Sequence, residues 1–142
     1  MKCLQTVNVL YTSSGSLKRM TPSSAGFDLT SDEQKTLSPY SVAVVKTGVK
    51  LEMPPHMYAA VLPRSGLSSK HGIVAVTGTI DSDYRGELCV ILYNTTHTTF
   101  HVSVGDRIAQ LVFHELAPVE LKEVQTLSET TRGTNGFGST GL

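Results

Sequence analysis

The chain has 142 residues, and its twelve acidic side chains balance its twelve basic ones. This length suits one domain with its own core, and the zero net charge disfavours recruitment of nucleic acid or an anionic membrane by a general field. No apolar run approaches the roughly 20 residues of a membrane span, and the N-terminus lacks the apolar stretch of a signal peptide. We therefore expect a cytoplasmic or nuclear protein without nucleic-acid or membrane partners, in which any phosphate recognition is local.

Short runs rich in β-branched, aliphatic and aromatic residues recur between turn residues. In chain order, the predicted strands are Val7–Tyr11, Val42–Lys46, Tyr58–Leu62, Ile73–Val76, Leu88–Tyr93, Thr99–Val104 and Ile108–Phe113. Such short strands separated by turns predict an all-β sandwich or barrel. Apolar spacing of 3.6 residues is nowhere sustained, and Ser65–His71 is expected to form only a helical turn. Exposed strand edges in such a domain favour oligomerisation.

The cysteines and histidines form no familiar metal or nucleophile pattern. Cys3 and Cys89, without a signal peptide, suggest reduced thiols, and the glycosylation sequon at Asn94 is then expected to be unused. His114 and the glutamate after it begin like a zinc-protease helix, but Pro118 stands where the second histidine belongs. The serine elbow of α/β-hydrolases is also missing from the sequence.

The segment 132–141 contains one arginine and one phenylalanine among glycine, serine, threonine and asparagine. Glycines let backbone N–H groups approach an anion closely, and Arg132 would add a fork of donors for a phosphate. Phe137 would offer an aromatic face to a planar base. Although many tails of this composition are only frayed ends, we interpret this one as a lid over a nucleotide.

Two further segments place polar groups beside predicted strands. Arg64 and Ser65 lie in a Pro/Gly turn and could bind an anion, although a plain strand-ending turn is the simpler interpretation. Residues 78–86 suggest two strands joined by a polar bend, with backbone groups exposed to the edge of a flat base. Asp81 follows an apolar residue, so partial burial would suit it as a general base. Asp83 is expected to be a turn or solvated residue.

Two carboxylates and an amide accompany the remaining polar segments. Asp28 stands among apolar residues and is expected to end a strand. A turn at Gly105 leads into a buried strand, where Asp106 and Arg107 are expected to stabilise the turn. Gln110 presents a neutral amide from that strand.

In this order, five segments resemble the five motifs of the trimeric deoxyuridine triphosphatases (dUTPases). The motifs are AGFDL from Ala25, PRSGLSSK from Pro63, GTIDSDYRGEL from Gly78, GDRIAQLV from Gly105 and RGTNGFGSTG from Arg132. The resemblance implies a jelly-roll-type β-sandwich or distorted barrel that forms a homotrimer with C-terminal arm exchange. Each of three active sites would take motifs one, two and four from one chain, motif three from a second and the tail from a third.

The resemblance also divides the single domain, residues 1–142. It implies an N-terminal strand and loop over 1–24, a β core over 25–131 and a glycine-rich lid over 132–142. The expected reaction is magnesium-assisted hydrolysis of dUTP to dUMP and pyrophosphate, which keeps uracil out of DNA and supplies dUMP for dTMP synthesis. Asp81 would activate the water that attacks the α-phosphorus, and Asp28 would hold a water of the Mg²⁺ ion.

The family's substrate contacts transfer to matching positions of this chain. The residues expected to bind dUTP are Arg64, Ser65, Gly66, Gly78, Thr79, Ile80, Asp81, Tyr84, Cys89, Gln110, Arg132, Phe137, Gly138 and Ser139. Backbone groups around 78–80 and 88–90 would recognise uracil, and Tyr84 would leave no room for a 2′-hydroxyl. Arg132 would bind the γ-phosphate, and Phe137 would stack on uracil. Cys89 departs from the glycine of many members, which is expected to be tolerated.

Two alternatives remain open at this point. A dCTP deaminase, or a bifunctional deaminase-dUTPase, shares the fold but usually has a tryptophan in motif three, and this chain has none. A regulatory relative acting through protein partners could have lost catalysis, but Asp81, Arg132 and the tail are all present.

Overall fold

The computed structural model describes residues 5–15 and 17–141, which form eleven strands and one short helix. The elements are β1 (Leu10–Thr12), β2 (Phe27–Thr30), β3 (Lys35–Leu37), β4 (Val42–Lys46), β5 (Lys50–Glu52), β6 (Met57–Leu62), α1 (Ser65–His71), β7 (Ile73–Ala75), β8 (Gly78–Ile80), β9 (Cys89–Asn94), β10 (Phe100–Val102) and β11 (Arg107–Glu115). Cys3 lies outside the described residues, so its predicted redox state is not addressed by the fold.

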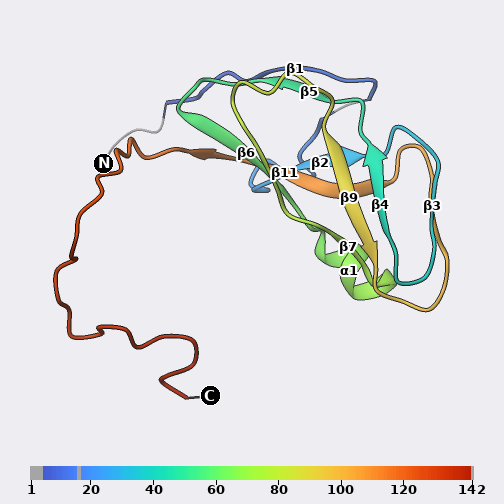
Figure 1. The fold of residues 1–142 in the computed structure, drawn as a ribbon. Helices are drawn as coiled ribbons and strands as arrows, with labels where there is room; N and C mark the ends of the chain where they lie inside the picture. The colour runs from blue at the N-terminus through green and yellow to red at the C-terminus, as the bar shows by residue number, and fades with distance from the viewer. Residues whose placement is uncertain (1–4, 16, 142) are drawn as a thin grey trace.

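Two antiparallel sheets form the body of the molecule, as Figure 1 shows. One has the strand order β2-β11-β6-β8 and the other the order β4-β9-β7, while β1 pairs with β5 and β10 with β3. Among the described residues neither sheet closes on itself. The all-β prediction is therefore confirmed in the form of open, packed sheets.

Alternation along the strands builds one core from both sheets. On β9, Val90, Leu92 and Asn94 are buried, and the residues between them face outward. Val90 and Leu92 belong to the same apolar cluster as Leu29 and Leu111 of the other sheet. Burial of each such aliphatic side chain contributes about 1.5–3 kcal/mol.

The sequon asparagine has a structural role. Asn94 is fully buried, and its amide donates hydrogen bonds to the carbonyl groups of Leu37, Ser38 and Thr98 at 3.2, 3.2 and 2.7 Å. Its side-chain oxygen accepts from Thr96. A glycan on Asn94 would require these bonds to break, because a buried amide cannot reach solvent in the fold.

Several predicted strands and the predicted helical turn are found at the expected residues. The strand Val42–Lys46 is β4 with the predicted bounds, and α1 is the short helical segment expected after Arg64. The predicted strand Val7–Tyr11 is displaced to β1. The short strands β3 and β5 were not predicted, because each has three residues with charged members and is defined by its pairing partner.

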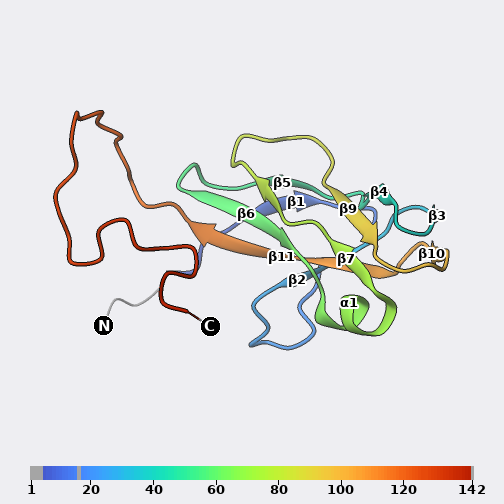
Figure 2. The same ribbon diagram turned by 60° about the horizontal axis from the view of Figure 1, so that its bottom comes forward.

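After β11 the chain leaves the body. Residues 116–141 form neither strand nor helix, and the two views agree that this segment extends away from the sheets (Figures 1 and 2). The one helix among the described residues, α1, is not long and apolar enough to cross a membrane.

Candidate active site

A pocket of about 220 Å³ lies where β2, β11 and the start of α1 meet. It is lined by Met20, Ser24, Gly26, Asp28, Arg64, Ser65, Gly66 and Gln110. Distant segments meet here because β11 pairs on one side with β2 and on the other with β6, which leads into α1. We call this cavity the arginine pocket; it brings together residues of the first, second and fourth predicted motifs.

Two arginines hold the carboxylate of Asp28. Arg64 Nε lies 3.3 Å from Oδ1 of Asp28, and the Arg107 guanidinium lies 3.8 Å from Oδ2. Arg64 also donates to the main-chain carbonyl of Arg107 at 3.1 Å. Two expectations are thus corrected: Asp28 lies within β2 instead of ending a strand, and Arg107 points to Asp28 instead of stabilising its turn. The Gly105 turn is held by Asp106, whose Oδ2 accepts the Ser103 N–H.

Gln110 is fixed in the same pocket. Its side-chain amide donates to the carbonyl of Pro63 at 2.9 Å. Gly26 permits this position, because a Cβ there would lie 2.5 Å from Oε1 of Gln110. By contrast, a Cβ on Gly66 would meet nothing within 4 Å, and Ser65 beside it is exposed. The mouth of the arginine pocket therefore stays open to a ligand.

Asp28 is the one carboxylate among the residues that line this pocket, so it is the residue that could contact the expected magnesium ion. Among the described residues, no group of three or more His, Cys, Asp or Glu is arranged to hold a metal. Asp28 is a single hard oxygen donor, 15 % exposed and already paired with arginines. It fits an ion that keeps its waters and takes most ligands from phosphate oxygens, which is how Mg²⁺ usually binds. It does not fit an ion held by the protein alone.

The two strands predicted over the third motif do not form a ladder with each other. β8 pairs with β6 as the edge strand of one sheet, and β9 lies in the other sheet between β4 and β7. A pocket between β8 and β9 is lined by Val44, Thr79, Ile80, Asp81, Tyr84, Glu87, Leu88, Cys89 and Ile91. We call this pocket the strand gap. β8 and β9 are separated because β8 pairs with β6 in one sheet and β9 pairs with β4 and β7 in the other.

The main chain of Cys89 faces the strand gap without a partner. Leu88 turns its carbonyl toward β4, where it accepts from the N–H of Thr47 at 3.3 Å. Ile91 turns its carbonyl the other way and accepts from the Val76 N–H at 2.8 Å. Alternation along β9 puts the N–H and C=O of Cys89 on the side of Ile91, beyond the end of the β7 ladder. Cys89 stands opposite Lys46 as a non-hydrogen-bonded pair of the β4–β9 ladder, and within residues 5–15 and 17–141 no hydrogen bond outside the ladders engages its N–H or C=O.

Tyr84 closes one side of the strand gap. Its N–H donates to the carbonyl of Asp81 at 3.2 Å, and its hydroxyl donates to the carbonyl of Glu87 at 3.0 Å. The ring lies against Gly86, where an added Cβ would collide with it. The predicted proximity of Tyr84 and Asp81 is therefore a feature of this turn.

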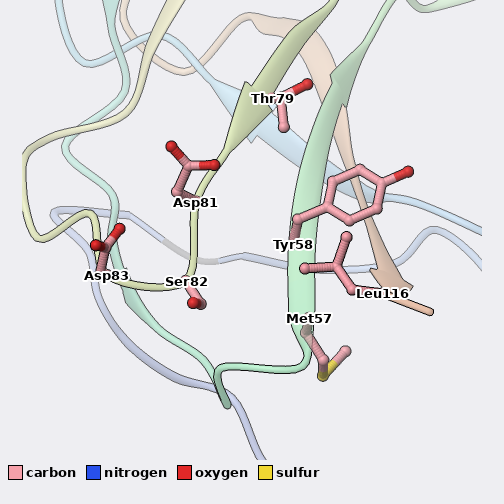
Figure 3. A pocket seen from close by; sticks show the side chains of 7 residues that line it. All are labelled: Met57, Tyr58, Thr79, Asp81, Ser82, Asp83 and Leu116. Carbon is pink, nitrogen blue, oxygen red and sulfur yellow. The ribbon is translucent and has the colours of Figure 1, made fainter. Parts of the chain in front are cut away.

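Asp81 stands at the end of β8, where the strand gap meets a second, open pocket. Figure 3 shows Asp81, Ser82 and Asp83 on the turn after β8, across from Tyr58 on β6 and Leu116 beyond β11. Asp81 is exposed, so the expected partial burial is not found in the single chain. The turn lies open to solvent in the described part of the chain because β8 is an edge strand. Asp83 is also exposed, as a solvated turn residue is expected to be.

The arginine pocket and the strand gap share no residue and lie apart in one chain. Gln110 pairs with Leu62 at one end of β6, while Ile80 pairs with Ala59 near the other end. Four residue steps along β6 and two strand spacings therefore separate Gln110 from Asp81, about 16 Å. A single phosphorus atom cannot contact both side chains within one chain.

Residues 132–141 line neither pocket, and the C-terminal segment extends away from the sheets (Figure 2). The Arg132 side chain donates to the carbonyl of Asn135 at 2.9 Å, and the Ser139 N–H donates to the carbonyl of Gly136 at 3.1 Å. Phe137 is fully exposed with φ of 50°, and Gly138 follows with φ of 84°. A large aromatic ring held in solvent by a left-handed turn is costly unless another surface receives it.

An exposed apolar face adjoins the strand gap. Val42, Val44, Ile91 and Tyr93 occupy the outer side of the β4-β9 pair, and each is at least 37 % exposed. Val76 continues this face beside β7. A contiguous apolar surface of this kind marks an interaction site.

Sequence reasoning did not assign three of the residues now found in or beside the arginine pocket. Arg107 lies in the same segment as Gln110, so its charge was available as an indication, but it was attributed to the turn. Met20 and Ser24 line the pocket from the loop before β2 and carry no pattern that indicates it.

Comparison with known proteins gives a consistent result. The sequence profile of the dUTPase family matches residues 13–141. The deoxyuridine 5′-triphosphate nucleotidohydrolase of variola virus is 49 % identical over 124 residues, which are 87 % of this chain and 84 % of that protein.

Solved structures agree with this match. The dUTPase of Staphylococcus bacteriophage 80alpha with dUPNHPP superposes with a TM-score of 0.91 at 29 % identity, over 96 % of this chain and all of that one. That work describes phage dUTPases that control transfer of virulence genes. A mutant dUTPase from phage phi11 of S. aureus, described with a structural Mg(II) ion, has a TM-score of 0.79 at 27 % identity and covers 84 % of this chain and 97 % of that one.

Proposed function

The chain belongs to the dUTPase family, and we propose that it hydrolyses dUTP to dUMP and pyrophosphate at sites shared between copies of the chain. The observation that best supports this substrate is the strand gap, where an unpaired backbone donor and acceptor stand beside the carboxylate of Asp81. The backbone donor and acceptor can bond the edge of a planar base, and the carboxylate can act as a base near the reacting phosphorus.

The nucleoside would bind in the strand gap. The pairing edge of uracil presents acceptor, donor and acceptor, so the N–H and C=O of Cys89 can bond two adjacent positions of it. Cytosine reverses the donor and acceptor order at two of these positions and would leave buried polar groups unpaired, which is costly. Backbone groups of Gly78, Thr79 and Ile80 on the free edge of β8 would contact the opposite side. Tyr84 would pack under the deoxyribose.

The triphosphate would bind in the arginine pocket of another copy. Ser65 and Gly66 lie at its open mouth, and Gln110 is already oriented by Pro63. Arg64 would supply positive charge to the phosphate chain, while Asp28 and Arg107 keep it oriented before the substrate arrives.

In the reaction, Asp81 would accept a proton from a water molecule as the water oxygen attacks the α-phosphorus. A new P–O bond forms, and the bond from the α-phosphorus to the bridging oxygen breaks in line with it. The electron pair leaves with pyrophosphate, and dUMP remains. Because the transfer is mainly a matter of alignment and charge neutralisation, one general base suffices.

Magnesium would be held chiefly by the phosphate oxygens, with Asp28 contacting it through a water. The ion would neutralise charge on the triphosphate. The structural Mg(II) ion described for the phi11 relative is consistent with metal use in this family.

A homotrimer would unite the separated parts. The separation of about 16 Å between Gln110 and Asp81, set by the strand register, argues against a site within one chain. The apolar face over β4 and β9 offers a surface for a second copy. Residues 132–141 would reach a third copy as a lid, with Arg132 on the γ-phosphate, Phe137 on uracil and the backbone of Gly138 and Ser139 around the phosphates. Exposed Val119, Leu121 and other apolar side chains on the preceding segment support arm exchange.

The same-fold alternatives are less well supported. The relatives reported above are named dUTPases, and no feature of the described residues favours deamination. Control of gene transfer is described for phage relatives, and among residues 5–15 and 17–141 no surface independently indicates a regulatory partner.

The substrate is tested by measuring pyrophosphate release from dUTP, dTTP, dCTP and UTP with Mg²⁺ or with EDTA. We expect rapid release from dUTP with Mg²⁺ and far slower release from the other nucleotides and with EDTA. Comparable turnover of dCTP, or formation of uracil nucleotides from it, would favour the deaminase alternative.

The shared site is tested by mixing two inactive variants. Asp81→Asn and Arg132→Ala chains are refolded together in equal amounts, and activity is compared with variants refolded separately. If the two residues reach each site from different chains, random trimers restore about one quarter of the sites. Verified mixed trimers without recovered activity would show that both residues act from one chain.

A further inference from the structure

A buried threonine outside the five motifs contacts the strand that faces the base. Thr47 is 3 % exposed and follows β4 directly. Its hydroxyl donates to the carbonyl of Leu88 at 2.6 Å, and its own N–H reaches the same oxygen at 3.3 Å. The hydroxyl oxygen accepts in turn from the Val49 N–H at 3.2 Å. Two donors on one carbonyl oxygen fix its direction firmly.

The oxygen held by Thr47 belongs to the peptide that presents a donor to the strand gap. A trans peptide is planar, so the C=O of Leu88 and the N–H of Cys89 point in opposite directions. Holding the oxygen toward β4 therefore aims the Cys89 N–H into the gap. A carbonyl that accepts hydrogen bonds also polarises its own peptide, which strengthens the N–H as a donor.

Neighbouring contacts fix Glu87 and the N–H of Leu88, on the N-terminal side of this peptide. The Gly48 N–H donates to Oε1 of Glu87 at 2.9 Å, and the Leu88 N–H donates to the Val49 carbonyl at 2.8 Å. Glu87 also accepts the Tyr84 hydroxyl on its main-chain oxygen. Gly48 is suited to this turn, because its φ is 69° and a Cβ there would collide with the side chain of Ser14.

We propose that Thr47 is a positioning residue for uracil: its hydroxyl, supported by Glu87, orients the Leu88–Cys89 peptide that the base contacts. The inference rests on the proposed function, since it assumes that uracil occupies the strand gap. Thr47 acts through the main chain of Cys89 and does not touch the reacting atoms. Its loss should weaken nucleoside binding and leave the chemistry at Asp81 nearly intact.

The test is Thr47→Val, which keeps the side-chain shape and removes the hydroxyl. We expect the Kd for dUMP and the KM for dUTP to rise about tenfold, while kcat changes less than about threefold. Thr47→Ser should restore both values. The matched control is Thr95→Val at the other end of β9, where a threonine hydroxyl likewise donates to a carbonyl, that of Gly72 at 2.7 Å. This control should leave dUMP binding unchanged.

The following results would overturn the proposed role of Thr47. A folded Thr47→Val chain with normal dUMP affinity, or a Thr47→Ser chain as weak as Thr47→Val, overturns the inference. If Thr47→Val does not fold, Glu87→Ala decides: we expect weaker dUMP binding, and unchanged affinity overturns the inference. Failure of the unaltered chain to cleave dUTP would refute the proposed function itself, which keeps the two failures distinct.

Discussion

The arginine pocket and the strand gap differ in whether their polar groups have partners within the described part of the chain. In the arginine pocket, charged and amide side chains are paired within the chain: Asp28 with Arg64 and Arg107, and Gln110 with Pro63. In the strand gap, the Cys89 main chain is left without a partner among the described residues. An unpaired charged side chain carries a large free-energy cost at a surface that becomes buried. A single peptide group that is still solvated carries little cost when it is unpaired.

This difference bears on how the two regions respond to mutation. Side chains in the arginine pocket can be deleted singly, and each deletion releases another charged or polar group. The recognition groups of the strand gap are main-chain atoms, so substitutions reach them only through neighbours. The predictions below test this contrast, beginning with the proposed general base, Asp81, which lines the strand gap.

The largest effect is expected from Asp81→Asn. The amide keeps the shape of the side chain but cannot accept the proton of water, so kcat should fall about 10²–10⁴-fold. Binding of a non-hydrolysable dUTP analogue, measured by calorimetry, should be retained. Asp83→Asn is the matched control on the same turn and should change kcat little. Near-normal turnover by Asp81→Asn would remove its assigned role.

The next effect is expected from Phe137→Ala. Stacking of one base on an aromatic ring contributes about 1–3 kcal/mol, so kcat/KM for dUTP should fall roughly 5–150-fold. Because the ring is fully exposed in the single chain, thermal stability should not change. Leu121→Ala, at another highly exposed apolar position before the lid, controls for loss of apolar surface on assembly. Unaltered kcat/KM would argue against the lid.

A smaller effect is expected from Gly26→Ala. The new Cβ would lie 2.5 Å from Oε1 of Gln110, so the amide must move and its bond to Pro63 must weaken. Loss of one such bond corresponds to about 1 kcal/mol, or roughly a fivefold rise in KM. In Gly15→Ala the Cβ meets only Thr30 Oγ1, at 3.7 Å, so this control should have normal kinetics. Equal KM values for both variants would contradict the role of Gly26.

The smallest effect concerns the Cys89 thiol. Burial raises its pKa above the ordinary value, Glu87 adds to the rise, and Lys46 opposes it. Because the unfolded thiol ionises first, this group lowers stability only as the pH rises above the unfolded pKa; below it the thiol is neutral in both states. In a Cys3→Ser chain at pH 8, alkylation by iodoacetamide should therefore be slower when folded than in urea. A faster folded reaction would contradict this direction.

Much of the fold could be predicted from local patterns. β4 and β9 are predictable because each is a short run of β-branched, aliphatic and aromatic residues bounded by turn residues, and α1 is predictable as the helical turn at Ser65–His71. The short strands β3 and β5 carry little apolar pattern and exist through pairing with β10 and β1. Asp28 was misplaced for the same reason, since β2 is defined by its register against β11.

By itself, the sequence determined the fold class, the family and the kinds of groups available for the reaction, because short strand-forming runs, turn residues and motif order can be read directly along the chain. Tertiary structure alone decided that β8 and β9 separate into two sheets, that Arg107 turns to Asp28, and that Thr47 holds the peptide of Cys89. These features depend on which strand edge meets which partner. Strand pairing joins residues far apart in the chain, and no local pattern specifies the edge that remains free.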